Sequence, residues 1–503
     1  MREAAHPLDT PCYTMLRDEE AGRTLLSRER TGAARDPGPS GGTLDRARWL
    51  LAERASRVLS EAGALPSAEP VGQVVRLVVP MGPVEPFRWL RDQSLFPKLY
   101  WSGREGWRGV ASLGMADVQE GDPLEGPDAL WKRLAPLLAS GDPRARYYGG
   151  LRFDPLREPD AEWAAFGACR FVLPRFELHA GEETKLVCNL VLPRDAERHA
   201  EILEQIEGLS SPQSSCEVAV PRPTTRTDGP DERGWRVNVE RALSAFSEGH
   251  LDKVVLARRT EFVFEREVEA ALLAESLERA TPGCFHFYVE PEEGVAFLGA
   301  SPERLFRREG RAIESEAVAG TRPRGASQED DAELRDELLR SEKDKAEHDH
   351  VRAGIGETLG PLCDELEVEA DVSEMKLASR RHLVSRVRGT LRDGVTDAEV
   401  LDALHPTPAV GGYPRPGALG EIRALEPFDR GWYAGPVGWI GAGGAEFAVG
   451  IRSGLVRGGR LALFSGAGIV AGSVPEGEWA EIEQKIGDFT RMFGLDPERH
   501  TAR

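Results

Sequence analysis

The sequence predicts a mixed α/β protein, and three observations carry that prediction. The chain has 503 residues, a length that permits two to three average domains or one large compact α/β body with additions. Hydrophobic residues make up 40% of it, which is enough for a full core. Short apolar runs typical of strands alternate along the chain with turns and with longer segments typical of helices.

The N-terminal half opens with a polar segment. Residues 1–43 end in a run of Pro, Gly and Ser, and we expect a disordered or poorly ordered extension there. Between residues 44 and 209, strand-like runs alternate with turns, and the two best strand candidates are 74–80 and 185–192. Residues 210–231 are rich in Ser, Pro, Thr and Asp, so we predict a surface linker that ends the N-terminal part.

The C-terminal half covers residues 232–497 and is predicted to alternate helices and strands. The predicted elements are, in order, a helix at 235–248, a strand at 253–258, a helix at 267–279, strands at 284–289 and 295–299, a long helix at about 328–358, a mixture of strand and short helix at 369–392, a helix at 416–424, strands at 445–452 and 460–465 joined as a hairpin through Arg457-Gly458-Gly459, and a helix from 475 to about 493.

The start of the last helix is the most informative stretch of the chain. Residues 465–481 run from a glycine-rich turn into a helix that opens with acids. Ser473 is a natural N-cap, and Glu476 three residues later would complete a capping box. Pro475 falls in the first turn, where a missing N–H costs nothing.

Two pairs of carboxylates share one spacing. Glu478 and Glu481 are three residues apart on the last helix, and Asp344 and Glu347 are three apart on the predicted long helix. Two helices that each present two carboxylates from one face could hold a hard divalent cation, and Mg²⁺ suits such oxygen ligands. The alternative is that these acids lie on solvated helix faces, because paired surface acids are common.

The glycine-rich turn adds a possible anion site beside the carboxylates. The backbone amides of Gly466, Ala467 and Gly468 would be free to hold an anion at the positive end of the helix. An anion site next to a cation site indicates a carboxylate or phosphate substrate bridged to a metal.

Two further residues could transfer protons. Lys253 stands in an otherwise apolar strand; it lies either at a rim with its ammonium in water or partly desolvated, where it could serve as a general base. Glu303 follows the end of an apolar strand; it either caps the next element or is a carboxylic acid whose pKa burial raises, able to protonate a leaving group.

Several basic residues are candidate anion contacts. A glycine-containing turn is predicted at 317–325, and it carries two arginines. His382, Arg386 and Arg452 are further candidates. Each of these could equally be an ion-pair residue.

Charge and cysteine content exclude some classes of function. Lys and Arg number 64 and Asp and Glu 84, so the net charge of −20 argues against a nucleic-acid partner, although a local basic pocket could still bind an anionic substrate. The six cysteines are scattered without metal-ligand spacing, which indicates a reduced, cytoplasmic protein. We find no apolar run of membrane-spanning length and no signal peptide, so no membrane partner is expected.

Taken together and in this order, these residues closely resemble the chorismate-utilising enzyme family, which includes anthranilate synthase component I, aminodeoxychorismate synthase component I, salicylate synthase and isochorismate synthase. The resemblance covers roughly residues 235–495. It implies one large catalytic body of stacked, mainly antiparallel sheets flanked by helices, with strands of the N-terminal part in the same core. The matching motifs are Asp252–Arg258, Phe297–Leu305, Ala319–Gly325, Ser341–His348, His382–Val387 and residues 465–481.

Three positions resemble the isochorismate-forming members. Lys253 stands where isochorismate and salicylate synthases carry a lysine that activates water. Ala319 replaces the nucleophilic lysine of aminodeoxychorismate synthases, and Ala409 matches isochorismate synthases where lyase-competent relatives typically have threonine. The segment Tyr148–Pro155 resembles the menaquinone-type isochorismate synthases. Asp344 departs from the family, since many relatives carry glutamate there.

The resemblance also implies a mechanism. Chorismate would be held through its ring carboxylate by Mg²⁺ and the Gly466–Gly468 amides, and through its enolpyruvyl carboxylate by Arg452. Lys253 would take a proton from the water that attacks C2, and Glu303 would protonate the departing C4 hydroxyl. The implied metal ligands are Glu347 and Glu481 directly, with Asp344 and Glu478 through water; the other substrate-binding positions are Gly320, Thr321, His382 and Ala409.

Three alternatives remain open at this stage. A salicylate synthase would also expel pyruvate, a siderophore pathway could use the same isochorismate, and a non-catalytic binding protein could share the fold. Because Lys253, Glu303 and all four acids are present, the non-catalytic alternative is the least favoured. No glutaminase subunit is expected for an enzyme that uses water.

Overall fold

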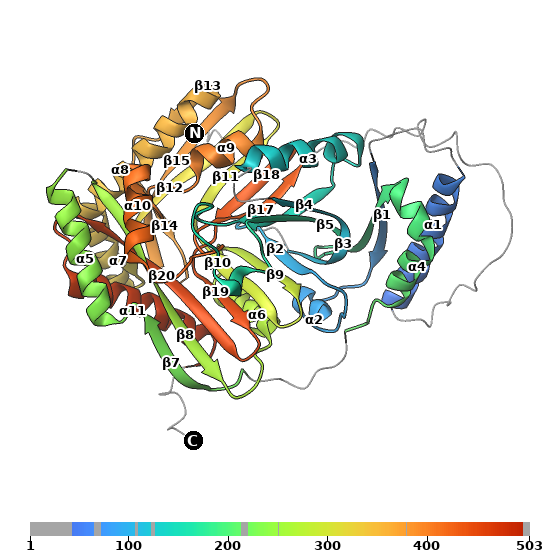
Figure 1. Cartoon of the computed structure of the whole chain (residues 1–503), viewed down its shortest axis with the longest axis horizontal. Helices are drawn as coiled ribbons and strands as arrows, with labels where there is room; N and C mark the ends of the chain where they lie inside the picture. The colour runs from blue at the N-terminus through green and yellow to red at the C-terminus, as the bar shows by residue number, and fades with distance from the viewer. Residues whose placement is uncertain are drawn as a thin grey trace, which may run out of the picture. The chain divides into compact units, whose positions relative to one another are not determined.

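Antiparallel pairing joins the strands throughout this protein (Figure 1). The computed structural model describes residues 43–64, 72–105, 109–121, 126–212, 220–249, 251–378 and 380–495. In these residues the strands form mainly antiparallel sheets and the helices flank them, so the predicted fold class is confirmed. The extension predicted for residues 1–43 lies outside the described residues, apart from Thr43, which begins the first helix.

The first ribbon of paired strands joins the two halves of the chain. Strands from the N-terminal part lie in it beside strands from the C-terminal half, as the resemblance implied. Its order is β1 (Gln73–Met81), β6 (Thr184–Leu192), β5 (Cys169–His179), β3 (Val110–Gly121), β2 (Lys98–Ser102), β9 (Phe285–Glu292), β10 (Val295–Ser301), β19 (Ser453–Arg457), β20 (Arg460–Val470), β8 (Lys253–Phe264) and β7 (Pro223–Gly229).

A second ribbon starts from the same β5. It runs through β4 (Arg146–Leu151), β17 (Pro436–Gly441), β18 (Gly444–Val449), β11 (Arg304–Glu309), β12 (Ala312–Pro323) and β15 (Arg380–Leu391), with β13 (Cys363–Val368) and β14 (Ser373–Lys376) both on β15. The short β16 (Gly412–Tyr413) pairs with β8. Aromatic rings from distant segments meet in the core; the ring centroids of Trp163 and Phe297, for example, lie 5.5 Å apart.

Helices cover the outer faces of these ribbons. The two helices α1 and α4 pack together against the β1 end, whereas α8 packs on β12 and β15 and α11 packs on β20 (Figure 1). The helices are α1 (Thr43–Gly63), α2 (Pro86–Arg91), α3 (Gly126–Ser140), α4 (His199–Glu207), α5 (Glu232–Ser247), α6 (Ala270–Ala280), α7 (Gln328–Arg340), α8 (Glu342–Leu359), α9 (Asp397–Leu404), α10 (Arg415–Leu425) and α11 (Pro475–Met492). None of these is long and apolar enough to cross a membrane.

The long helix predicted at 328–358 is two helices. Ser341 has an extended backbone, which ends α7, and its hydroxyl accepts a hydrogen bond from the amide of Asp344 at 3.2 Å. Serine is a favoured N-cap because its oxygen satisfies an amide that lacks a partner in the first turn. Ser341 therefore fixes the start of α8, and with it the position of the first acid pair.

Three other element predictions need correction. The described part of the predicted 210–231 linker contains β7, whose threonines suit a strand and which pairs with β8; residues 213–219 are outside the described residues. The predicted 445–452 and 460–465 hairpin is wrong, because Arg452 has φ of 48° and interrupts the strand. The hairpin joins β19 and β20 instead. The described residues of 369–392 form strands, without the predicted short helix.

Candidate active site

A cavity of about 290 Å³ collects most of the predicted site residues. It lies among β8, β12, β15, β20, α8 and α11, so segments far apart in the sequence supply its walls. The volume is near the lower end of small-molecule pockets. The predicted residues in its walls are Glu303, Ala319, Gly320, Thr321, Asp344, Glu347, His382, Ala409, Arg452, Gly466, Gly468, Glu478 and Glu481.

Lys253 lies directly behind this wall and is completely buried, with 0% of its surface exposed. Of the two alternatives, the solvent-facing rim is therefore wrong and the desolvated position is confirmed, while the role of Lys253 as a base stays a prediction. Its Nζ donates a hydrogen bond to Oε1 of Glu347 at 2.8 Å. A Cβ at position 468 would lie 2.7 Å from the same Glu347 oxygen and 3.3 Å from Cε of Lys253, so glycine at 468 makes room for this pair.

Glu303 lies between β10 and β11 and is 4% exposed. Burial raises the pKa of its carboxyl to about 8, although the nearby Lys253 ammonium acts in the opposite direction; the charge of Glu316 raises it further. A carboxyl with this pKa carries its proton at neutral pH. The predicted rise in pKa is thus confirmed, while the role of Glu303 as an acid stays a prediction.

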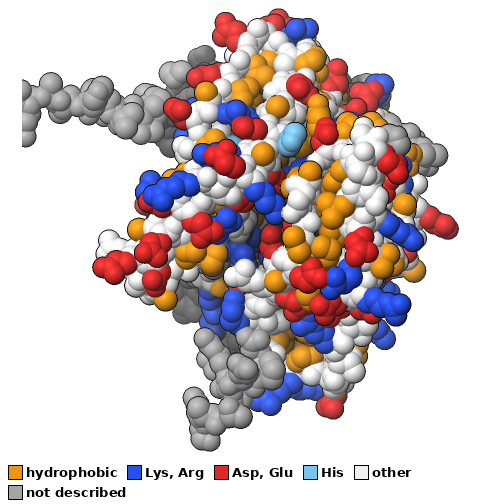
Figure 2. Space-filling view, turned by 90° about the vertical axis from the view of Figure 1, so that its left-hand side faces the viewer, with side chains coloured by type: hydrophobic (Ala, Val, Ile, Leu, Met, Phe, Trp, Pro, Cys, Tyr) orange, Lys and Arg blue, Asp and Glu red, His pale blue; other side chains and the backbone are white. Residues whose placement is uncertain are grey.

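Both acid pairs face the cavity. Asp344 and Glu478 are 8% and 4% exposed, so the solvated-surface alternative is wrong for them, and Glu347 and Glu481 are partly buried in the cavity wall. Figure 2 shows the face of the molecule that lies at the left of Figure 1, and acidic and basic side chains are intermixed on it. Each acid is paired with a different cation: Asp344 with Arg322 at 2.9 Å, Glu347 with Lys253 at 2.8 Å, Glu478 with Lys343 at 3.2 Å and Glu481 with Lys485 at 2.7 Å.

The donor chemistry of these residues fits Mg²⁺. Four carboxylates on two helices offer the hard oxygen ligands that Mg²⁺ prefers. Within the part of the chain that the structure describes, no three His, Cys, Asp or Glu side chains converge on one metal position. The acids are turned to their basic partners instead, so the ion pairs would have to open for coordination.

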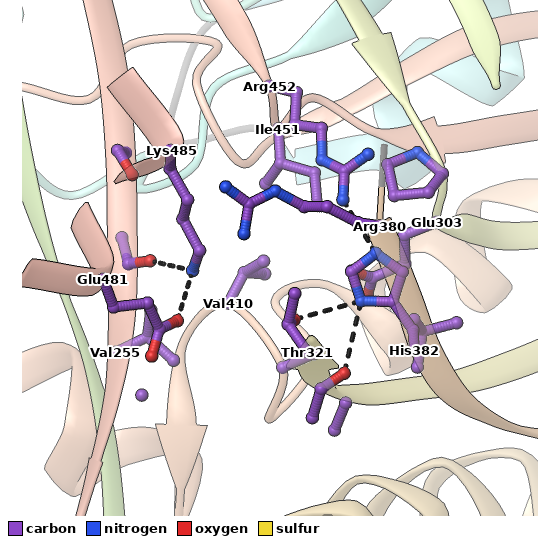
Figure 3. Close-up of a pocket in the computed structure, with 18 of the residues that line it drawn as sticks. Val255, Glu303, Thr321, Arg380, His382, Val410, Ile451, Arg452, Glu481 and Lys485 are labelled. Carbon is purple, nitrogen blue, oxygen red and sulfur yellow. Dashed lines mark hydrogen bonds and ion pairs between the residues drawn. The ribbon is translucent and has the colours of Figure 1, made fainter. Parts of the chain in front are cut away.

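A chain of contacts centred on His382 fixes another part of the cavity wall (Figure 3). Nη2 of Arg452 lies 2.7 Å from Nε2 of His382. Because arginine only donates, Nε2 accepts and the ring proton is assigned to Nδ1, which faces the carbonyl of Gly320 at 3.3 Å and Oγ1 of Thr321 at 3.1 Å. Burial and the Arg452 charge hold the pKa of His382 well below its usual range, in agreement with a neutral ring.

The backbone of Gly320 has an unusual conformation. Its φ of +70° lies in the left-handed region, and the pairing of β12 with β15 shifts register at this residue. The segment predicted as a turn at 317–325 is therefore largely strand with a bulge. The two arginines of this segment are engaged in ion pairs, Arg322 with Asp344 and Arg324 with Asp331.

The glycine-rich segment is also strand rather than turn. Gly466 and Gly468 lie in β20 opposite Ala257 and Val255 of β8, whose amides donate elsewhere, to Glu426 and Gly411. Opposed residues in an antiparallel pair exchange both hydrogen bonds or neither. The amides of Gly466 and Gly468 therefore point away from β8, on the side where Lys485 donates to the Gly466 carbonyl at 2.8 Å.

Four smaller predictions at the site are wrong. Ala467 faces the core because successive residues of a strand alternate, and it does not line the cavity. Arg386 is exposed on β15, outside the cavity.

Ser473 does not cap α11; the N-cap is Val474, without a side-chain bond, so no capping box with Glu476 forms. The Ser473 hydroxyl accepts from the amide of Val470 instead.

Sequence reasoning missed several residues of the cavity wall. Lys485, Asp488 and Met492 follow Glu481 by four, seven and eleven positions on α11, and this helical stripe was the signal that could have found them. Arg380 lies two residues before His382 on β15, hence on the same face. Its Nε donates to Oδ2 of Asp488 at 2.7 Å, and Figure 3 shows Arg380 and Lys485 directed into the same space.

Comparisons with known proteins agree with this arrangement. Residues 59–494 match the family model described as chorismate binding enzyme. The chain is 37% identical over 398 residues to isochorismate synthase 2, chloroplastic, of Arabidopsis thaliana, covering 76% of this chain and 70% of that protein. It is 33% identical over 428 residues to isochorismate synthase MenF of Haemophilus influenzae, covering 84% and 92%. The solved structure of Escherichia coli MenF, a menaquinone-specific isochorismate synthase, superposes with a TM-score of 0.75 at 29% identity, covering 89% of this chain and 100% of that one.

Proposed function

This chain belongs to the chorismate-binding enzyme family, and on that premise we propose that it converts chorismate into isochorismate. One observation carries the proposal: the fully buried Lys253 and the protonated Glu303 are close enough to influence each other electrostatically at the edge of one cavity. A potential base and a potential acid at one site match a reaction that adds water and removes hydroxide.

In the proposed reaction, Lys253 acts as a neutral amine, so it first loses the proton with which it is ion-paired to Glu347. The amine then takes a proton from a water molecule as the water oxygen bonds to C2 of chorismate. The ring double bonds shift, the C4–oxygen bond breaks, and Glu303 gives its proton to the departing hydroxyl, which leaves as water. Atoms and charges balance, since one water enters and one leaves, and the proton gained by Lys253 returns through solvent to Glu303 before the next turnover. Each positioned proton transfer is typically worth ~10²–10⁴ in rate.

The substrate has two carboxylates, and the cavity offers a partner for each. Arg452 would bind the enolpyruvyl carboxylate, held in place by its contact with His382. The amides of Gly466 and Gly468, which point away from β8, would bind the ring carboxylate. The chemistry that Mg²⁺ would supply is positive charge at this ring carboxylate, with Glu347 and Glu481 as direct ligands and Asp344 and Glu478 acting through water.

The finer assignments are proposals on the same premise. A role in menaquinone formation is supported by the similarity to the MenF proteins, and a siderophore route is the alternative. We propose a cytoplasmic enzyme that works without a glutaminase subunit, because water replaces ammonia as the nucleophile.

Product analysis tests the proposed function. The protein is incubated with chorismate and Mg²⁺, and the products are separated by chromatography. Isochorismate as the main product is expected. Salicylate together with pyruvate would mean that the enzyme is a salicylate synthase, and unchanged chorismate would mean that the proposed activity is wrong.

A further inference from the structure

Three of the four cations that pair with the cavity carboxylates are held in place, one by complete burial and two by further contacts. Lys253 is fully buried in β8. Arg322 also donates to Glu337 at 2.8 Å, and Lys485 also donates to the carbonyl of Gly466 at 2.8 Å. None of these three can leave its carboxylate without giving up other interactions or its place in the fold.

Lys343 differs from these three. Its side chain is 54% exposed, whereas the side chain of its partner Glu478 is 5% exposed, and their 3.2 Å hydrogen bond joins α8 to α11. Lys343 lines the same cavity as Glu478, Glu347 and Glu481. A half-exposed ammonium thus lies beside a buried carboxylate, in a cavity that acids of both pairs line.

We propose that Lys343 is a built-in competitor of Mg²⁺, which neutralises Glu478 and withdraws to solvent when Mg²⁺ binds. The inference rests on the proposed Mg²⁺ site. Two cations beside one buried carboxylate repel each other, so one has to leave, and the long exposed side chain of Lys343 can do so at low cost. The need to displace Lys343 lowers the affinity for Mg²⁺, while its presence keeps Glu478 from being buried without a partner.

The same helix offers a matched control. Lys345 lies two residues further along α8, is 43% exposed and pairs with Glu342, outside the cavity. The variants Lys343→Met and Lys345→Met therefore remove the same charge from the same helix, but only the first removes it from Glu478. Lys343→Gln keeps a hydrogen-bond donor without the charge and serves if Lys343→Met does not fold.

The experiment is calorimetric titration of the full-length proteins with MgCl₂ at fixed ionic strength, together with melting temperatures with and without Mg²⁺. We expect Lys343→Met to bind Mg²⁺ about 3- to 10-fold more tightly than the wild type. Its melting temperature without Mg²⁺ should be lower, and its gain on adding Mg²⁺ larger. Lys345→Met should resemble the wild type in both measurements.

The outcomes separate this inference from the proposed metal site. If the wild type binds no Mg²⁺, both are wrong. If the wild type binds Mg²⁺ but the Lys343 variants bind it equally or less tightly, the Mg²⁺ site stands and the competition is refuted. Equal tightening in Lys343→Met and Lys345→Met would show a general charge effect of α8 and would also refute it.

Discussion

Nζ of Lys253 lies 2.8 Å from Oε1 of Glu347, so the proposed base is hydrogen-bonded to a proposed metal ligand. One residue comes from β8 and the other from α8, and Gly468 of β20 leaves the space in which they meet. The residue proposed to transfer a proton and a residue proposed to bind Mg²⁺ are therefore linked by one hydrogen bond.

The carboxylates are expected to differ in their effect on Mg²⁺-dependent turnover. Glu347→Ala and Glu481→Ala should abolish activity without unfolding the protein, because they remove direct ligands, whereas Asp344→Ala and Glu478→Ala should cost about 10- to 100-fold. Glu342→Ala is the control, since Glu342 is 90% exposed on α8 and does not line the cavity. Rates at varied Mg²⁺ check this, and full activity in excess EDTA would refute a metal role.

Glu303 should control the alkaline limb of the pH profile. Its pKa is raised to about 8, and the protonated form is the one that can donate to the C4 hydroxyl. Wild-type kcat/KM for chorismate should therefore fall as the pH rises through about 8. Glu303→Gln should lose ~10²–10⁴ in kcat. An alkaline limb that persists unchanged in the residual activity of Glu303→Gln would assign it to another group.

The same carboxyl should affect stability with a definite sign. Its pKa is about 8 in the folded state and ordinarily 4.5, so the folded protein binds the proton more tightly. The contribution of the protonated Glu303 carboxyl to the free energy of unfolding is then fully present below about pH 4.5. It is lost as the pH rises towards 8, by at most about 1.4 kcal/mol per pH unit. The free energy of unfolding of Glu303→Gln, relative to the wild type, should rise from pH 5 to 8 and level off above. Urea unfolding of both proteins checks this, and a constant difference would contradict it.

Arg452 should act on substrate binding. Arg452→Ala is expected to raise KM for chorismate by about 10- to 100-fold, the range for a lost hydrogen bond to a charged group. Arg386→Ala is the control, because Arg386 lies exposed on β15 outside the cavity. Steady-state kinetics of both variants test the assignment, and an unchanged KM and kcat in Arg452→Ala would rule it out.

Periodicity in the sequence was enough to predict α5, α10, α11 and the strands β8, β9, β10 and β20, because their apolar patterns are local. The strands β11, β17 and β19 were not predicted, and β12 was predicted as a turn. The positions that failed depend on tertiary structure. Gly466 and Gly468 indicated a turn because glycine is unfavourable in strands, yet the space needed by Lys253 and Glu347 explains Gly468. The positive φ of Arg452, which separates β18 from β19, leaves no signal in a single sequence.

The site itself was predicted in kind rather than in detail. The spacing of the acids and the family resemblance brought the right residues together, but burial of Lys253 could not be derived, since a fully buried lysine requires a partner that is distant in sequence. Three of the four ion pairs of the acids were likewise not predictable, because Lys253, Arg322 and Lys343 reach Glu347, Asp344 and Glu478 only through the fold. The pair of Glu481 with Lys485 has i,i+4 spacing on α11 and was open to prediction.

The most direct test of the central claim is the reaction of the wild-type protein with chorismate in ¹⁸O-labelled water, followed by mass spectrometry of the isochorismate formed. Because the base at Lys253 is proposed to activate a water molecule and Glu303 to release the original hydroxyl, the product should carry one ¹⁸O atom, at C2. Isochorismate without the label would show that the hydroxyl moves within the substrate, and the proposed roles of Lys253 and Glu303 would be contradicted.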